Sequence, residues 1–201
     1  CVSGILLNHR SLIKNVDISR KYLPNNYKYE NWNGGLLRGT LALDNKVLLY
    51  GNGGIWETDS AASFFADFNK GLPKGADNQQ IRNVIKTDNG KIMAVSPFAL
   101  YRYGEHEAWH EMKLPLADDE KLTDIASHGD TLVVLSRSYA YISLHPYINF
   151  KRIQLNTPKD YKERVSLLRT VWLLHSGELF GVTGRLAVDI IAVILVLLCI
   201  T

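Results

Sequence analysis

The feature that most constrains this chain is an unbroken apolar run of eleven residues, Ile190–Ile200, close to its C-terminal end. With the residues before it, the apolar stretch covers positions 180–201, which is about the length that a helix needs to cross a bilayer. Arg185 and Asp189 would share a helix face and could pair there. A buried core helix is the alternative, but such a run leaves no polar face. We therefore predict a truncated transmembrane helix.

The N-terminal residues 1–10 have the composition of the end of a second apolar helix. They begin CVSGILL, which is too short to span a membrane, and no initiator methionine, basic stretch or cleavage site indicates a signal peptide. We interpret them as the end of a truncated transmembrane helix, with a lipoprotein beginning at Cys1 as the alternative. The cysteines Cys1 and Cys199 both lie in these apolar ends, so no disulfide framework is available. The net charge of +3 does not indicate a nucleic-acid partner.

Three segments of the middle region share one pattern: an apolar β-rich run, a short turn and a second run with an aromatic residue. They are Val47–Asp59, Ile92–Gly104 and Leu132–Leu144, with the aromatic residues Trp56, Tyr101 and Tyr141. Their starts are 45 and 40 residues apart, and a period of about 40–45 residues with four strands per unit is typical of propeller blades. Since propellers have about four to eight blades, three units indicate a partial propeller or a stacked β assembly. Three unrelated hairpins in a sandwich are the alternative.

The predicted fold is therefore mainly β, with a propeller-like extracytoplasmic repeat domain flanked by two truncated transmembrane helices. The predicted parts are the helix end at 1–10, an irregular connector at 11–35, the β-repeat domain at 36–150, a second connector at 151–165, and a helix entering and crossing the membrane at 166–201. Basic residues near both apolar ends would favour a cytoplasmic domain, but that rule weakens for a loop of this length.

One motif has the form of a zinc-protease site. His106 and His110, with Glu107 after the first histidine, match the pattern HExxH. That chemistry requires a helix, on which the two histidines face one metal with the glutamate beside it. The repeat places this segment where a strand belongs, and on a strand the histidines would be about 13 Å apart. We interpret the motif as a chance match and predict no metal site.

Two other histidines lie where the predicted helices meet the membrane surface. If the helices form a hairpin, His9 and His175 lie at the same membrane face, and two neutral imidazoles could ligate a haem iron for electron transfer. Gly177 and Gly181 have the spacing of close helix packing, which would leave room for a flat cofactor beside His175. The alternatives are interfacial histidines with polar partners and simple helix–helix contact.

Both ends of the sequence resemble a known family. The segments Ser3–Arg10, Leu174–Arg185 and Leu197–Thr201 resemble the transmembrane helices of PepSY-associated transmembrane proteins, in which a His-x-Gly and a later Gly-Arg recur. The middle, with Asn69–Gly75 and a Gly-Ile-Trp turn, is similar in outline to the Bacteroidetes branch, often labelled iron-regulated membrane proteins. The resemblance covers the ends strongly and the middle only in outline.

The resemblance implies a protein of the bacterial inner membrane with residues from about 11 to 170 in the periplasm. It implies haem b held by His175 and His9, and electron transfer to a ferric siderophore or another iron-bearing acceptor, as in a membrane reductase component. No PepSY domain is recognisable between the helices, and a β-repeat region occupies its place. The alternative function is a non-enzymatic membrane-anchored sensor or scaffold whose β domain binds a protein partner. A zinc protease is the remote alternative.

Overall fold

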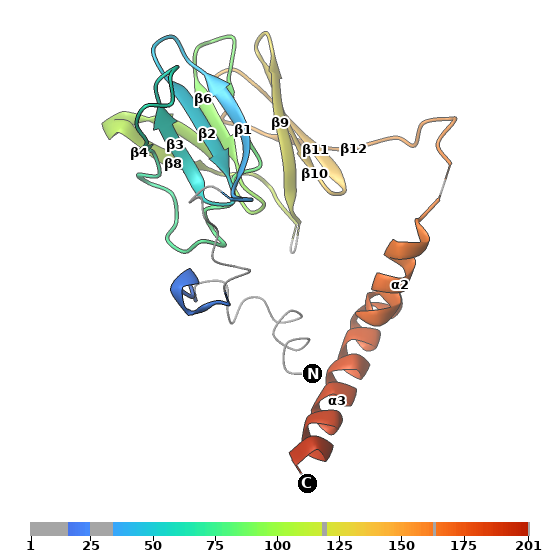
Figure 1. Ribbon diagram of the computed structural model, residues 1–201. Helices are drawn as coiled ribbons and strands as arrows, with labels where there is room; N and C mark the ends of the chain where they lie inside the picture. Colours follow the sequence, from blue (N-terminus) through green and yellow to red (C-terminus); the bar gives the residue numbers. More distant parts are fainter. Residues whose placement is uncertain (1–15, 25–33, 118–119, 163, 201) are drawn as a thin grey trace. The chain divides into compact units, whose positions relative to one another are not determined.

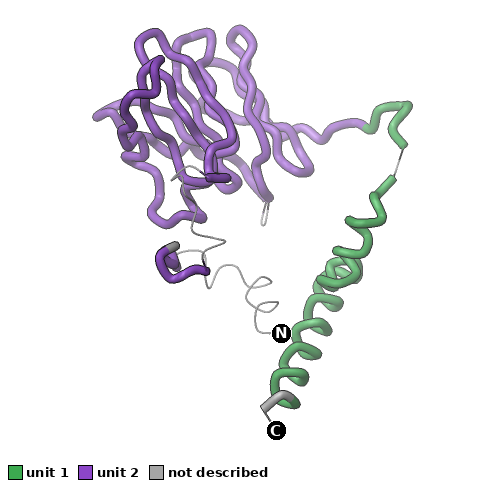
Figure 2. Tube along the Cα trace, in the orientation of Figure 1, with its two compact units in different colours: residues 1–14, 157–201 green, residues 15–156 purple. Residues whose placement is uncertain are grey.

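The computed structural model describes residues 16–24, 34–117, 120–162 and 164–200, and the chain divides into two compact units (Figure 2). One unit is Asn15–Asn156, and the other combines Cys1–Lys14 with Thr157–Thr201. The helix end predicted at 1–10 lies outside the described residues, as does His9.

The larger unit contains three four-stranded antiparallel sheets, each built from four consecutive strands (Figure 1). The first sheet has β1 (Leu37–Ala42), β2 (Val47–Gly51), β3 (Gly54–Thr58) and β4 (Ala66–Asp67). The second has β5 (Asn83–Lys86), β6 (Ile92–Val95), β7 (Leu100–Gly104) and β8 (Ala108–Met112). The third has β9 (Leu122–His128), β10 (Thr131–Ser136), β11 (Tyr139–Leu144) and β12 (Lys151–Gln154). The prediction of a mainly β domain is confirmed, and the three repeats correspond to the central strand pairs of the three sheets.

The sheets also share one register. In each, the aromatic residue of the third strand pairs across the sheet with an aliphatic residue of the second: Leu49 with Trp56, Ala94 with Tyr101, and Val134 with Tyr141. Because side chains alternate between the two faces of a strand, equal register gives the three sheets equivalent faces. We call the face with these aromatic pairs the front of each sheet and the opposite face its back.

The sheets pack face to face, so two hydrophobic cores lie between them. Leu48 and Ile55 on the back of the first sheet share a core with Tyr101 and Trp109 of the second. Met93 on the back of the second sheet shares the other core with residues from the front of the third, among them Ile125, Leu132, Val134 and Tyr141. Both faces of the middle sheet are therefore covered, and its residues Met93, Ala94 and Val95 are fully buried.

The first strands of the three sheets, β1, β5 and β9, lie beside one another. Asn83 in β5 links β2 of the first sheet to β9 of the third, because its Oδ1 accepts a hydrogen bond from the Tyr50 hydroxyl at 2.8 Å and its Nδ2 donates to Asp124 at 2.7 Å. Burial raises the pKa of Tyr50, so the hydroxyl stays a donor beyond the pH at which an exposed tyrosine ionises. The sheets form no closed ring within the described part of the chain.

One correction concerns the end of the β region. The predicted connector 151–165 begins with a strand, since β12 pairs with β11 and completes the third sheet. The only helix before the sheets in the described residues is the short 3-10 turn Arg20–Tyr22.

The C-terminal unit contains two helices instead of one continuous helix. α2 (Leu167–His175) begins after Ser166, whose hydroxyl accepts from the Arg169 amide, and the 3-10 turn Glu178–Phe180 leads into α3 (Gly181–Ile200). The segment Glu178–Leu198 has a mean hydropathy of 2.2 and few buried side chains, so its length and composition are compatible with a membrane span. Among the described residues it is the one helix with these properties.

We expect the substitution Asn83→Ala to destabilise the β unit, because it removes the links to Tyr50 and Asp124 at once. A hydrogen bond that leaves a part-buried partner unpaired costs about 1–3 kcal/mol. Urea unfolding followed by tryptophan fluorescence measures the change, with Asn45→Ala at an exposed turn as the control. Equal midpoints for the two variants would show that Asn83 does not connect the sheets.

Candidate functional site

The HExxH residues do not share a helix. His106 and Glu107 lie in the 3-10 turn Glu105–Glu107, where His106 has φ 59°, and His110 lies in β8. The His110 ring is 3.0 Å from the Glu105 carbonyl oxygen, and the His106 carbonyl accepts from the Lys70 ammonium at 2.7 Å. The segment is thus a turn followed by a strand, not a strand throughout as the repeat predicted. Neither arrangement brings the two histidines to one face of a helix, as zinc catalysis requires.

The described residues hold no cluster of three or more histidine, cysteine, aspartate or glutamate side chains with a metal-binding arrangement. Trp109, between Glu107 and His110, has a structural role instead. Its Nε1 donates to the Phe68 carbonyl at 2.8 Å and its backbone amide donates to the Lys70 carbonyl, so β8 is tied to the chain that follows β4. The motif thus lies in a segment that joins the first two sheets.

His175 is the last residue of α2, and its side chain is exposed. The second predicted haem ligand, His9, lies outside the described residues, so the described chain supplies one imidazole of the pair and no axial pair can be built from it. Haem binding by His175 and His9 therefore stays a prediction, as does electron transfer to an iron-bearing acceptor.

Gly177 and Gly181 lie at the break between the two helices. Both have positive φ, 73° and 64°, a conformation that glycine adopts readily and that a continuous helix does not contain. A Cβ on Gly177 would lie 2.4 Å from the Gly184 carbonyl oxygen, so the backbone already fills the space beside this glycine. The structure therefore gives these glycines a local role in the turn between α2 and α3.

The candidate interaction surface lies in the β unit, on the back of the third sheet. In the first two sheets the back residues at the same register, Leu48 and Met93, are fully buried against the next sheet. Their counterpart in the third sheet is Val133, which is half-buried, and its neighbour Leu135 is 38% exposed. We call this surface the open back face; its apolar members are Val133, Leu135, Ala140, Ile142, Leu144 and Ile153.

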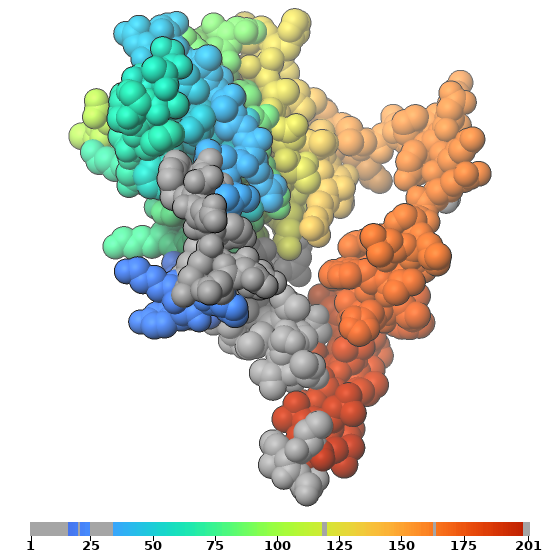
Figure 3. Space-filling view, viewed as in Figure 1, coloured from blue at the N-terminus to red at the C-terminus, as the bar shows by residue number. Residues whose placement is uncertain are grey.

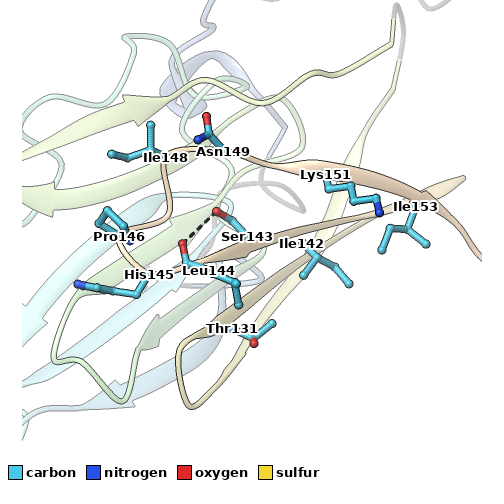
Figure 4. A pocket seen from close by; sticks show the side chains of 10 residues that line it. All are labelled: Thr131, Ile142, Ser143, Leu144, His145, Pro146, Ile148, Asn149, Lys151 and Ile153. Atoms are coloured by element: carbon cyan, nitrogen blue, oxygen red, sulfur yellow. Dashed lines mark hydrogen bonds between the residues drawn. The ribbon is translucent and has the colours of Figure 1, made fainter.

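An apolar hollow of about 580 Å³ lies on this face at the end of the sheet (Figure 4). Ile142 and Leu144 of β11 and Ile153 of β12 line it, together with the turn that contains Pro146 and Ile148. Leu144 is 65% exposed. Apolar residues exposed together on a sheet are a common mark of an interaction surface.

The front of the first sheet is the other end of the stack. Trp56 and Leu49 lie there, at the positions that Tyr101 with Ala94 and Tyr141 with Val134 occupy in the next two sheets. Tyr101 and Tyr141 are buried against the preceding sheet, whereas Trp56 and Leu49 are only half-buried. The space-filling view shows the first sheet in blue and cyan and the third sheet in yellow and orange (Figure 3).

Sequence reasoning missed the open back face. The signal was present, because β10 and β11 (TLVVLS and YAYISL) carry apolar residues on both faces instead of alternating with polar ones. Strands of that composition are usually buried on both sides. The recurring aromatic residues identified the repeat, but they did not indicate which face of a sheet would be left uncovered.

The comparisons with known proteins give a likeness of fold. The chain matches no family model and no curated protein. Two solved structures of the extracellular domain of BT4673 from B. thetaiotaomicron, named as a hybrid two component system in one and a one component system in the other, are each 14% identical. Their TM-scores are 0.52 and 0.50, over 59% and 58% of this chain.

PorZ, a surface component of the type-IX secretion system of Porphyromonas gingivalis, is 20% identical over 58% of this chain, with a TM-score of 0.44. The chain spans less than a fifth of the length of each of these proteins: 17% of the first BT4673 structure and 16% of the other two. At these identities the BT4673 likeness concerns the fold alone.

If His175 and His9 hold haem, the full chain expressed with added haem has a Soret band that both His175→Ala and His9→Ala remove. An exposed histidine of the β unit, His128, provides the control: His128→Ala should leave the visible spectrum unchanged. The absence of a Soret band in the unsubstituted protein would contradict haem binding.

Proposed function

We propose that this protein is a non-enzymatic, membrane-anchored β-repeat module that docks another four-stranded β-sheet on its open back face. The observation that carries the proposal is that three back residues occupy equivalent positions in the three sheets. The back positions that bury Leu48 and Met93 between sheets are occupied in the third sheet by Val133, which is half-buried and has no covering sheet among the described residues. This function corresponds to the sensor or scaffold predicted as the alternative from the sequence.

The chemistry of the face supports a protein partner. Its exposed members Leu135 and Leu144 are aliphatic, whereas an enzyme site needs polar groups that meet a reacting atom. The ionisable residues that line the hollow are His145 and Lys151, and both are exposed. An apolar sheet face is stabilised best by another apolar face at the usual sheet spacing of about 10 Å.

The preferred arrangement is propeller-like. Two features support this proposal. The first strands β1, β5 and β9 are neighbours, and one register is repeated in three consecutive sheets. Corresponding turns are also linked at a similar sequence interval: Asp44 contacts Lys86, and Asp88 accepts from the Gly129 amide. A docked sheet would add a further unit to the same series.

We place the β unit outside the cytoplasm, on a bacterial inner membrane, with α3 as its anchor. The apolar segment Glu178–Leu198 supports the anchor, and the fold likeness to extracellular domains supports the location. A module tethered in this way can sense or organise proteins in the compartment that it faces.

A photo-reactive benzophenone amino acid at position 144 tests the docking function in cells that produce the full chain. We expect covalent adducts from Leu144, because a docked sheet would lie against it. Phe98, an exposed aromatic residue in the β6–β7 turn, is the control position and should give none. Mass spectrometry of the adduct identifies the cross-linked segment. The absence of adducts at position 144, or equal adducts at both positions, would contradict the function.

A further inference from the structure

We infer that α2 lies in the interfacial layer of the bilayer that α3 crosses, with its apolar side toward the lipid acyl chains. The bilayer is thus the partner of this helix, and α2 gives the protein a second membrane contact beside the spanning segment. The inference rests on α3 as the proposed anchor and is independent of the docking of a sheet on the open back face. The two helices follow one another in the C-terminal unit (Figure 1).

One side of α2 is apolar and exposed. Residues three, four or seven positions apart lie on the same side of a helix, and on this side α2 carries five large apolar residues that are each at least half exposed: Leu167, Leu168, Val171, Trp172 and Leu174. The last residue of the helix, His175, lies on the same side with an exposed imidazole. We call this side the apolar face of α2. Burying it in a bilayer would remove this apolar surface from water.

The opposite side of α2 is mostly polar and has partners in the same unit. The Arg169 guanidinium lies 3.9 Å from the Glu178 carboxylate, and the Thr170 hydroxyl donates to the Ser166 carbonyl at 3.1 Å. Leu173, between these two positions around the helix, is half-buried. α2 is therefore amphipathic, and helices of this kind lie along a membrane surface with their apolar side about 5–10 Å deep.

The length of the apolar segment Glu178–Leu198 places α2 at the depth of the interface. At about 1.5 Å per residue, its 21 residues extend about 30 Å, the thickness of the hydrocarbon core. The nine residues of α2 are too few to cross a bilayer, and only Ser176 and Gly177 separate them from the segment. The turn with positive φ at Gly177 and Gly181 interrupts the helix, so α2 can lie along the surface while α3 crosses.

Trp172 and Arg169 favour a lipid surface over a protein surface as the partner. The Arg169 guanidinium lies over the Trp172 ring, 4.8 Å from its centroid, at the border between the two sides of α2. Tryptophan rings are enriched at the headgroup level of membranes, and long basic side chains there extend toward the polar layer. The pair thus has the composition and the position of an interfacial anchor.

Charge contributes little to this contact. Positions 157–178 contain four basic and three acidic residues, so the segment is nearly balanced. Burial of the apolar face, and not attraction to anionic headgroups, would therefore hold α2 at the surface. Vesicles of uncharged phosphatidylcholine are accordingly a sufficient partner for the test.

Site-directed spin labelling of the full chain in phosphatidylcholine vesicles tests this placement. After Cys1→Ser and Cys199→Ser, a single labelled cysteine is introduced by Leu168→Cys or Val171→Cys on the apolar face, or by Thr170→Cys as the matched control. A label among acyl chains collides more with oxygen and less with a water-soluble nickel chelate. We expect the oxygen-to-nickel accessibility ratio to be severalfold higher at positions 168 and 171 than at position 170.

A label introduced by Val193→Cys in α3 tests the anchor separately, and its ratio should be high. Equal ratios at positions 168, 170 and 171, with a high ratio at 193, would overturn the inference and leave the anchor intact. Low accessibility to both reagents at 168 and 171 would also overturn it, since a protein surface would then cover the apolar face. A low ratio at position 193 would overturn the anchor and the inference together.

Salt distinguishes apolar burial from charge attraction in the same samples. Screening by added salt weakens attraction between exposed charges and not apolar burial, so the ratios at positions 168 and 171 should stay the same in concentrated sodium chloride. A fall of both ratios to the value at position 170 would overturn the inference, because charges would then hold α2 at the surface.

Discussion

A sheet with apolar side chains on both faces must be covered on both faces, and the rest of this structure depends on that requirement. The middle sheet meets it completely: Met93 and Ala94, neighbours on β6 that point to opposite faces, are both fully buried. Within the described residues, the third sheet meets it on one side only. The three sheets thus form a stacked series that is stable through two internal cores and open at the back of the third sheet. The proposed partner would gain the most by binding this open back face.

The polar contacts between the sheets determine how these cores align. Asn83 of the second sheet connects Tyr50 of the first sheet with Asp124 of the third. The Trp109 indole of the second sheet donates to the carbonyl of Phe68, which follows β4 of the first sheet. Apolar packing alone is non-directional, so such contacts set the register of one sheet on the next. The same register, repeated in three sheets, is what makes the open back face equivalent to the backs of the first two sheets, which are buried.

The repeat could be predicted from sequence because an aromatic residue recurs at Trp56, Tyr101 and Tyr141, each on the third strand of its sheet. The repeat also predicted a strand at His110, which lies in β8. The turn at His106 could not be predicted, since it depends on positive φ values at non-glycine residues. The helix break at Gly177 and Gly181 was missed because the same spacing is typical of helix packing. β12 was missed because Lys151–Gln154 has little apolar character of its own and is held by pairing with β11.

Hydrogen–deuterium exchange of the full chain tests most directly whether the stack is open at its third sheet. The account predicts that amides of β6 and β7, in the covered middle sheet, exchange slowly. Those of β10 and β11, in the sheet with the open back face, should exchange faster. Exchange in β10 and β11 that is as slow as in β6 and β7 would contradict it.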